Sequence, residues 1–239
     1  MTSRHRDTLR ILVTGTSRGI GLAVTDEMLA RGHTVVGLAR TRLESRTSAK
    51  FAGRFYGIVC DVRKEADVER SVRKAASLVG PIDMVVHSAG ITAFREFRKT
   101  SIREFDDVLD TNLRGTILVT KAVLPAMIRR RSGTIVNIVS YAAKTVYTDS
   151  SAYSASKAGV TALMNSLREE VRKYNIKIVN VFPGAVETAM WPVSVRKKYG
   201  KVMMSPAELA QIVCDAVTRP AHHVVEELVV RPVVGDLRI

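Results

Sequence analysis

The chain has 239 residues, of which 46% are hydrophobic and 25% are charged, and its formal net charge is +14. These proportions are typical of a globular protein with enough apolar material for a buried core, and they exclude a disordered or fibrous chain. The basic residues are spread along the sequence, and no helix-turn-helix, zinc-finger or aromatic-basic motif accompanies them. The charge therefore does not predict nucleic-acid binding, and most of it is expected on the solvated surface.

The N-terminus and the cysteines bear on the cellular compartment and on whether to expect disulfides or metal sites. After the basic start MTSRHRDTLR only residues 11–13 are apolar, which is too short for a signal peptide or a membrane-spanning helix. Cys60 and Cys214 lie far apart and near no His or Cys cluster, so we expect neither a disulfide nor a metal site. We expect a cytoplasmic protein that contacts no membrane, with both cysteines packed as small hydrophobic side chains.

Short β-branched runs alternate with longer amphipathic segments along the chain. The expected strands are residues 10–14, 34–39, 55–59, 84–88, 134–139, 177–182 and 227–230. The expected helices are residues 20–31, 66–78, 106–129, 153–174 and 206–218. Several of the strands are almost continuously apolar, as strands buried on both faces are. The alternation predicts an α/β fold in one domain spanning residues 1–239, a doubly wound parallel sheet with helices on both faces.

A glycine-rich turn, VTGTSRGIG, joins the first strand to the first helix. Gly15, Gly19 and Gly21 allow a tight turn and a close approach of backbone to phosphate, and the helix N-terminus offers free N–H groups to a pyrophosphate. Glycines in a turn are weak evidence alone, but their place between a first strand and a first helix predicts nucleotide binding. The residues expected at the nucleotide are Gly15, Thr16, Ser17, Arg18, Gly19, Ile20 and Gly21.

The end of the second strand indicates which nucleotide binds. An acidic residue there would accept a hydrogen bond from the adenosine ribose 2′-OH of NADH, but this strand ends at Ala39 and Arg40. Arg40 and Arg18 carry the positive charge and the donors that a 2′-phosphate requires. The sequence therefore favours NADPH, and the alternative is that Arg40 is an ordinary solvated loop residue.

The glycine spacing TGxxxGxG and the motifs that follow it resemble those of classical members of the short-chain dehydrogenase/reductase family. Ser140 follows a strand, Tyr153 and Lys157 form a Tyr-x-x-x-Lys pair, and Asn112 lies upstream in DTNLRG, which together match the family's catalytic set. The resemblance extends from about residue 9 to about residue 190. It implies a Rossmann fold, and a homotetramer or homodimer assembled through helices 106–129 and 153–174.

The resemblance also implies further cofactor contacts. Asp61 and Val62 match the pair that lines the adenine pocket, and Thr188, in PGAVET, matches the threonine that contacts the nicotinamide carboxamide. His87 and Ser88 replace the family's usual Asn-Asn, and we expect His87 to be a buried, hydrogen-bonded structural residue. The cofactor-binding residues expected beyond the glycine turn are Asp61, Val62, Ser88, Ala89, Gly90, Tyr153, Lys157, Pro183, Gly184, Val186 and Thr188.

Carbonyl reduction explains why these residue types occur together. Delivery of hydride to a carbonyl carbon requires a proton for the developing alkoxide. A tyrosine has an unperturbed pKa of about 10, and we expect the ammonium of Lys157 to lower the pKa of Tyr153. Ser140 would hold the carbonyl oxygen, and Asn112 resembles the family residue that anchors a water of a proton relay.

Residues 185–205 are expected to cover the substrate. Met190 and Trp191 either line an apolar substrate pocket or pack this segment against the domain. Family members that act on 3-oxoacyl chains dock an acidic acyl carrier protein on basic residues near the site. Arg131 and the run Arg196, Lys197 and Lys198 are candidates for this role, although a solvated basic face explains them equally well.

The leading hypothesis is an NADPH-dependent reductase of a ketone, an aldehyde or a 3-oxoacyl thioester, similar to 3-oxoacyl-(acyl carrier protein) reductases. An alcohol, sugar or steroid dehydrogenase working oxidatively would use the same residues. A non-catalytic NADPH-binding sensor or scaffold would tend to have lost Tyr153 or Lys157, and both are present. Epimerases and dehydratases of the extended relatives usually have another glycine spacing and a longer C-terminal part.

Overall fold

A computed structural model of the chain describes residues 8–41, 50–218 and 223–237. Its strands form one parallel seven-stranded sheet in the order β3-β2-β1-β4-β5-β6-β7. The strand bounds are β1 Arg10–Thr14, β2 Thr34–Ala39, β3 Phe55–Val59, β4 Met84–His87, β5 Gly133–Ile138, β6 Ile176–Pro183 and β7 Glu227–Val230. The fold class and the predicted strands are confirmed, each strand end lying within a residue of its prediction.

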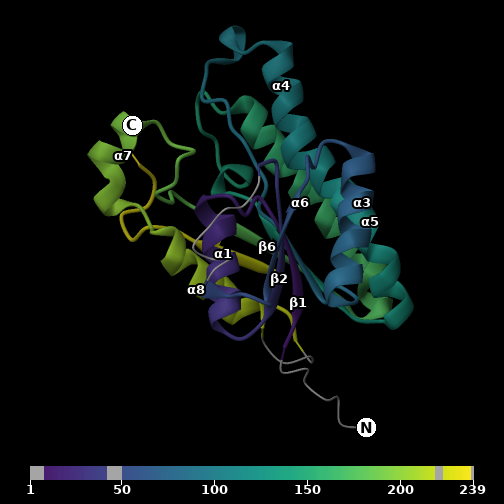
Figure 1. The fold of residues 1–239 in the computed structure, drawn as a ribbon. Helices are drawn as coiled ribbons and strands as arrows, with labels where there is room; N and C mark the ends of the chain where they lie inside the picture. Colours follow the sequence, from purple (N-terminus) through teal and green to yellow (C-terminus); the bar gives the residue numbers. More distant parts are fainter. Residues whose placement is uncertain (1–7, 42–49, 219–222, 238–239) are drawn as a thin grey trace.

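Helices cover both faces of the sheet (Figure 1). The α-helices of the described residues are α1 Gly19–Ala30, α3 Glu65–Val79, α4 Ile102–Leu109, α5 Gly115–Arg130, α6 Ser151–Val171, α7 Val193–Tyr199 and α8 Pro206–Val217. Helices α1 and α8 pack together on one face, while α3, α5 and α6 cover the other. None of the helices within the described ranges is long and apolar enough to cross a membrane.

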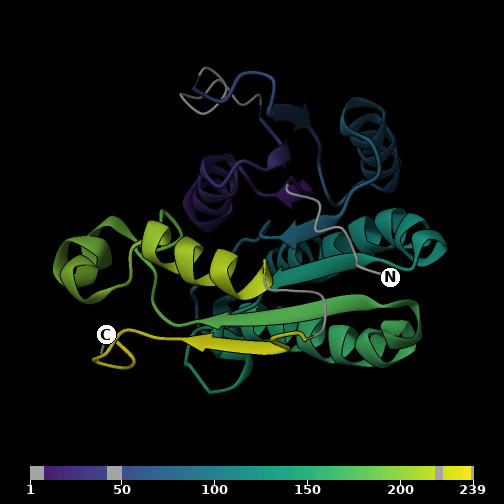
Figure 2. The ribbon, with the colours of Figure 1, turned by 90° about the horizontal axis from the view of Figure 1, so that it is seen from below.

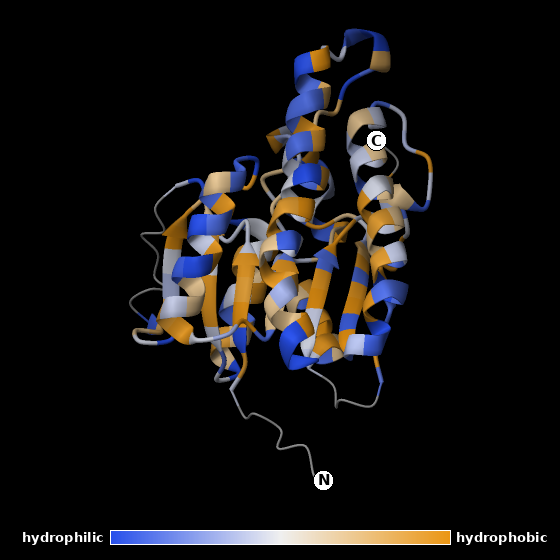
Figure 3. Cartoon of the chain, turned by 90° about the vertical axis from the view of Figure 1, so that its right-hand side faces the viewer, coloured by the Kyte–Doolittle hydropathy of each residue, from blue (hydrophilic) through white to orange (hydrophobic). Residues whose placement is uncertain are grey.

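Alternation along the central strand explains the two layers. In β1, Ile11 packs with the core under α1 and α8, and Leu12 packs with the core under α3, α5 and α6. Both side chains are fully buried, as the apolar pattern of a strand covered on two faces predicts. The strands accordingly form a hydrophobic layer between more polar helix surfaces (Figure 3). Cys60 and Cys214 are free and buried in these two cores, as predicted.

The predicted helix 106–129 is wrong as a single element. The structure has two helices, α4 and α5, joined by a π-helical turn, Asp110–Arg114. Helix α4 begins earlier than predicted because Ser101 and Glu104 form a reciprocal capping box at its N-terminus. The π-helical turn carries Asn112 into the interior, where it is 1% exposed, and such turns occur frequently at functional sites.

The strand order reverses between β1 and β4, so the chain leaves these two neighbouring strands in opposite directions across the sheet. In doubly wound sheets the crevice outside the carboxyl ends of such strands is where ligands bind. The residues that follow β1, β4, β5 and β6 therefore converge on one edge of the molecule. Helix α7, which was not predicted, lies in the segment after β6 at this same edge (Figure 2).

Candidate functional site

The glycine-rich turn leaves no room for side chains between β1 and the loop after β4. Gly15 has a φ of 76°, and a Cβ built on it would lie 2.8 Å from the Cα of Ala89. A Cβ on Gly21 would lie 2.4 Å from the carbonyl oxygen of Gly15. Of the other residues predicted here, Ser17 and Arg18 are exposed, whereas Thr16 is buried, with its hydroxyl 3.5 Å from the carbonyl oxygen of Leu38. The backbone here is shaped for close approach of a ligand.

Two exposed arginines flank the outer end of this turn. Among the residues that the structure describes, neither Arg18 nor Arg40 takes part in an ion pair. The Asp61 carboxylate, in contrast, accepts hydrogen bonds from Nε and Nη2 of Arg63, whose Nη1 donates to Asp107 of α4 at 3.0 Å. The Arg63 hydrogen bond holds the pKa of Asp61 below its usual range, and the charge of Arg40 adds to this. Nothing in the sequence marks Arg63 as the partner of Asp61.

The loop after β4 is fixed to β1 through one buried hydroxyl. The backbone N–H groups of Ser88 and Ala89 both donate to Thr14 Oγ1 at 3.1 Å. His87, at the end of β4, is 5% exposed and lies with its Nε2 3.0 Å from the hydroxyl of Thr120. Burial, with a smaller effect of the Lys157 charge, lowers the pKa of His87 to about 3, so the ring is neutral. The prediction of a buried, hydrogen-bonded structural histidine is confirmed.

Asn112 holds the next part of that loop against α6. Its Oδ1 accepts from the N–H of Ile91, and its Nδ2 donates to the Ile91 carbonyl, all at 2.9 Å. The same Nδ2 also donates to Ser156 Oγ at 3.0 Å. Since both amide hydrogens are engaged, the Asn112 side chain clamps the loop and the helix together.

Ser140, Tyr153 and Lys157 come together at the carboxyl ends of β5 and β6. Ser140 caps the 3-10 turn Tyr141–Ala143, and its hydroxyl is hydrogen-bonded to the Tyr153 phenol. Lys157 is 7% exposed, and its Nζ donates to the carbonyl of Ile138 at 2.8 Å. This ammonium lies 5.7 Å from the centroid of the Tyr153 ring. The structure thus assembles the predicted tyrosine, lysine and serine in one place.

The protonation of the pair differs from the prediction. Burial raises the pKa of Tyr153, with the Ser140 hydrogen bond opposing it, and burial lowers the pKa of Lys157 to about 8. The predicted lowering of the Tyr153 pKa is therefore wrong for this structure, because desolvation of the buried phenol outweighs the opposing effect of the Ser140 hydroxyl. At pH 7 the phenol is protonated and the lysine is mainly an ammonium.

The segment after β6 returns to the glycine-rich turn. Val186 is buried and forms a parallel bridge with Met204, and a Cβ on Gly19 would lie 3.4 Å from the Thr188 methyl group. Trp191 stacks on Phe94 of the loop after β4, with ring centroids 5.1 Å apart and an interplanar angle of 17°. Met190 is half-buried beside Thr188. Nothing in the sequence marks Phe94 as a site residue, because the contact joins distant loops.

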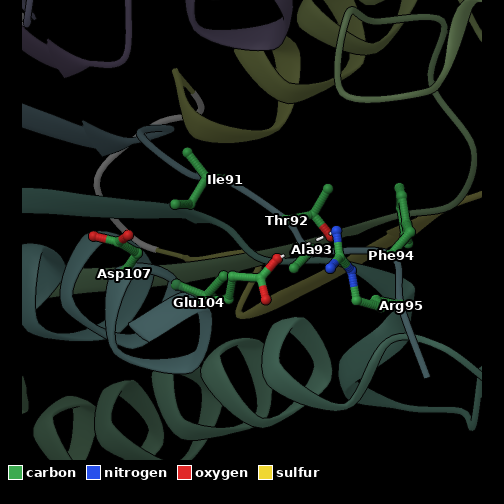
Figure 4. A pocket seen from close by; sticks show the side chains of 8 residues that line it. Ile91, Thr92, Ala93, Phe94, Arg95, Glu104 and Asp107 are labelled. Carbon is green, nitrogen blue, oxygen red and sulfur yellow. Dashed lines mark ion pairs between the residues drawn. The ribbon is translucent and has the colours of Figure 1, made fainter. Parts of the chain in front are cut away.

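A cavity of about 290 Å³ lies between the loop after β4 and α4 (Figure 4). Its lining includes Phe94, and Arg95 and Glu104 form an ion pair across it at 3.5 Å. The hydroxyl of Thr92 is buried here without a hydrogen-bond partner in the described part of the chain. The cavity begins at Ile91, directly after the predicted cofactor residue Gly90, and so lies beside the site.

The basic residues considered for docking separate in space. Arg131 ends α5 just before β5 begins, and its guanidinium donates to the carbonyl of Lys173. Within one chain it therefore lies at the opposite end of β5 from Ser140, so its predicted place near the site is wrong. Arg196 belongs to α7, at the same edge as the site, and its Nε donates to the Trp191 carbonyl at 3.3 Å.

Comparisons of sequence and of structure with known proteins find dehydrogenases and reductases in each case. The family model described as short chain dehydrogenase matches residues 10–198. Sepiapterin reductase of Chlorobaculum tepidum is 34% identical, over 95% of this chain and 98% of the relative, and an uncharacterized oxidoreductase of Staphylococcus haemolyticus is 32% identical, over 93% and 96%. A variant of actinorhodin polyketide ketoreductase solved with NADPH has a TM-score of 0.86 at 31% identity, covering 99% of this chain and 100% of that chain. An alcohol dehydrogenase of the archaeon Thermococcus sibiricus complexed with 5-hydroxy-NADP has a TM-score of 0.87 at 26% identity, covering 97% and 100%.

The packing of Gly21 predicts that Gly21→Ala disrupts the glycine-rich turn. The added methyl group would collide with the Gly15 carbonyl, which is backbone and cannot rotate away. We expect a lower unfolding temperature by circular dichroism and loss of dinucleotide binding, read by quenching of the single tryptophan, Trp191. Gly200→Ala is the control, since its methyl group would meet only the mobile carboxylate of Glu187. Equal dinucleotide affinity in both variants would contradict this account of the turn.

Proposed function

Since the chain belongs to the short-chain dehydrogenase family, we propose that it is an NADPH-dependent oxidoreductase that reduces a carbonyl group to an alcohol. The observation that carries the proposal is the cluster of Tyr153, Ser140 and Lys157 at the carboxyl edge of the sheet, beside a glycine-rich turn. A non-catalytic NADPH-binding sensor or scaffold would not need this set. We propose Tyr153, Ser140 and Lys157 as the catalytic groups, with Asn112 as the residue that positions them.

The residues present fit a dinucleotide. Gly15 and Gly21 form a cradle that any Cβ would fill, and the first turn of α1 carries N–H groups without intrahelical partners, as an anionic pyrophosphate requires. Two arginines without ion pairs in the described ranges, Arg18 and Arg40, suit a 2′-phosphate. NADPH and 5-hydroxy-NADP in the two similar structures support this choice. We assign the remaining contacts to Asp61, Val62, Ser88, Ala89, Gly90, Pro183, Gly184, Val186 and Thr188.

The dihydronicotinamide, when bound, supplies the hydride that forms the new C–H bond at the carbonyl carbon. The electron pair of the C=O π bond moves to oxygen, which takes the proton of the Tyr153 hydroxyl. Ser140 donates to the same oxygen and holds it against the phenol. The phenolate that remains is stabilised by the Lys157 ammonium, whose pKa of about 8 suits it to return a proton near neutral pH.

Asn112 has a positioning role in addition to the water-anchoring role that the resemblance implies. Its side-chain amide is engaged with Ile91 and Ser156, and the water-anchoring role stays a prediction. We propose that it holds the loop after β4 and the first turns of α6 in register. The neighbouring Lys157 keeps its place because its own helix is fixed by this contact.

Tyr153 is in the protonation state that a reduction requires. Burial keeps the phenol protonated at neutral pH, and a reduction consumes a proton from this group. An oxidation would need the phenolate instead, which burial disfavours. The oxidative dehydrogenase, which would use the same residues, is the second hypothesis.

The substrate that the site suits best is a small planar carbonyl compound. Phe94 and Trp191 come from opposite loops and stack on each other, and we propose that an outer face of this pair receives a conjugated ligand. Sepiapterin, named in one relative, is a compound to test first.

We propose that residues 185–205 cover this substrate. Docking of an acyl carrier protein stays a prediction that rests on Arg196, Lys197 and Lys198 of α7, and assembly as a homodimer or homotetramer stays a prediction from the family.

Replacement of the catalytic phenol tests the function itself. Tyr153→Phe should fold and bind NADPH like the wild type, and its turnover should fall by about two to four orders of magnitude because the general acid is lost. The assay is NADPH absorbance with a panel of ketones, aldehydes and 3-oxoacyl thioesters. Tyr174→Phe, at the end of α6 away from the site, is the matched control. Undiminished turnover of the Phe variant would refute the assignment of Tyr153.

Replacement of Arg40 tests the cofactor. Arg40→Asp removes a charge-assisted hydrogen bond and adds a like charge, so the ratio of kcat/KM for NADPH to that for NADH should fall by about a hundredfold. Arg73→Asp, an exposed arginine on α3, is the control and should leave the ratio unchanged. If the ratio is the same in both variants, Arg40 is not the determinant of cofactor choice.

Replacement of Trp191 tests the substrate class. Trp191→Leu keeps an apolar side chain but removes the flat partner of Phe94, so kcat/KM for sepiapterin should fall by about fivefold, corresponding to an aromatic pair of about 1 kcal/mol. Activity on a small aliphatic ketone should change little, and this substrate is the internal control. An equal loss for both substrates would indicate that Trp191 only packs the covering segment.

A further inference from the structure

The C-terminal part of the chain returns to the edge of the sheet where the site lies. We define the C-terminal strap as residues 227–236, which comprise β7 and the segment after it (yellow in Figure 2). Strand β7 pairs with β6 in register up to the contact of Val230 with Pro183. The Gly184 N–H donates to the Val230 carbonyl at 2.8 Å, and a Cβ on Gly184 would lie 3.0 Å from Cδ of Pro232. The strap therefore packs closely on the turn that follows β6.

From this position the strap contacts the loop that joins Ser140 to Tyr153. We call residues 141–150 the catalytic loop. The Arg231 guanidinium lies 4.1 Å from the centroid of the Tyr141 ring, one residue after Ser140. Arg231 is held in turn by an ion pair with Asp236 at 2.9 Å, and Asp236 accepts a hydrogen bond from the Tyr147 hydroxyl.

A second contact lies at the start of the strap. Lys144 Nζ is 2.6 Å from a carboxylate oxygen of Glu227 and 4.2 Å from the centroid of the Phe182 ring in β6. Each of these surface contacts contributes little to stability alone. They form one connected group, however, because Glu227, Arg231 and Asp236 all reach the same loop.

The catalytic loop depends on such outside contacts. Its regular structure is limited to the 3-10 turn Tyr141–Ala143, Val146 is 93% exposed, and Asp149 has a φ of 57°, which is unfavourable for a non-glycine residue. A segment with few buried apolar contacts opens locally at low free energy. On its other side, one backbone hydrogen bond joins the Arg95 N–H to the Asp149 carbonyl. The strap adds ion-pair, hydrogen-bond and cation–π contacts to the few that this loop makes through Ala142, Ala143 and Ser150.

We propose that the C-terminal strap is a positioning element of the active site, with Arg231 as its central residue. By holding the catalytic loop at Tyr141, Lys144 and Tyr147, it keeps the Ser140 hydroxyl in hydrogen-bonding contact with the Tyr153 phenol. Arg231 touches neither group, and it acts through Tyr141. This inference rests on the proposed carbonyl reductase function, and it adds a determinant of turnover that lies outside the family's catalytic set.

The first test is steady-state kinetics of Arg231→Gln. This variant loses both the cation over Tyr141 and the ion pair with Asp236, so kcat should fall by about tenfold to a hundredfold, since small misplacements of catalytic groups have effects of this size. The Kd for NADPH, measured by Trp191 fluorescence, should not change. Arg231→Lys retains a cation and should restore most of the turnover. Tyr147→Phe, which removes a single hydroxyl, should lower kcat by a smaller factor.

Arg73→Gln is the matched control, because Arg73 forms an exposed ion pair with Glu69 far from the site. Turnover of Arg231→Gln equal to that of Arg73→Gln would overturn the proposal. So would a loss of kcat accompanied by an equal weakening of NADPH binding, or one that Arg231→Lys does not restore, because a general loss of folded structure would produce these results.

Amide hydrogen exchange tests the strap independently of activity. In Arg231→Gln the amides of residues 141–150 should exchange faster than in the wild type, while those of α3 should not change. Unchanged exchange in the catalytic loop would overturn the proposal whether or not a substrate is known. If the wild type reduces no carbonyl compound in the panel, the proposed function fails, and the exchange result still decides whether the strap holds the loop.

Discussion

The close approach of β1 and β4 at their carboxyl ends is the constraint on which the site depends. Thr14, buried at the end of β1, accepts two backbone N–H groups from the loop after β4. Gly15 then passes so near Ala89 that no Cβ could be accommodated between them. With these two turns locked together, α1 begins with its N-terminus directed at the crevice, and Ile91 is brought within reach of Asn112. A nucleotide site and a catalytic site become neighbours through this contact.

Burial, more than charge pairing, sets the protonation of the catalytic pair. Lys157 is held by a backbone carbonyl at the end of β5, and desolvation lowers its pKa, while desolvation raises that of Tyr153. Both shifts favour the neutral form of the side chain. In water the pKa values of tyrosine and lysine are similar, and here burial separates them. Its raised pKa keeps the Tyr153 phenol protonated at neutral pH, and its lowered pKa makes the Lys157 ammonium a stronger acid than a lysine in water. In the proposed reduction this arrangement suits one proton passed from the Tyr153 phenol to the substrate oxygen, after which Lys157 returns a proton to the phenolate.

The sheet and the order of the motifs could be predicted because they depend on local patterns. Apolar runs identify strands wherever these are buried on both faces, and Tyr153 and Lys157 share a helix face by spacing alone. The division of helix 106–129 could not be predicted, because the amphipathic pattern runs through the π-helical turn without a break. Arg131 was misplaced because adjacency in sequence to the Ser140 strand says nothing of which end of that strand a residue occupies. The pKa of Tyr153 depends on burial, which appears only when the chain is folded.

The contacts of Phe94 with Trp191 and of Arg231 with Tyr141 share a property that explains why sequence patterns do not reveal them. Each joins loops that lie far apart in the chain and meet only because parallel strands deliver their carboxyl ends to one edge. The strands of the sheet thus position Ser140, Tyr153 and Lys157, and side chains from separate loops pack beside these residues. On the proposed function, substitutions in these loops would alter substrate fit and the position of Ser140 without changing the buried strands. Substrate preference can therefore diverge between relatives that share the same catalytic set.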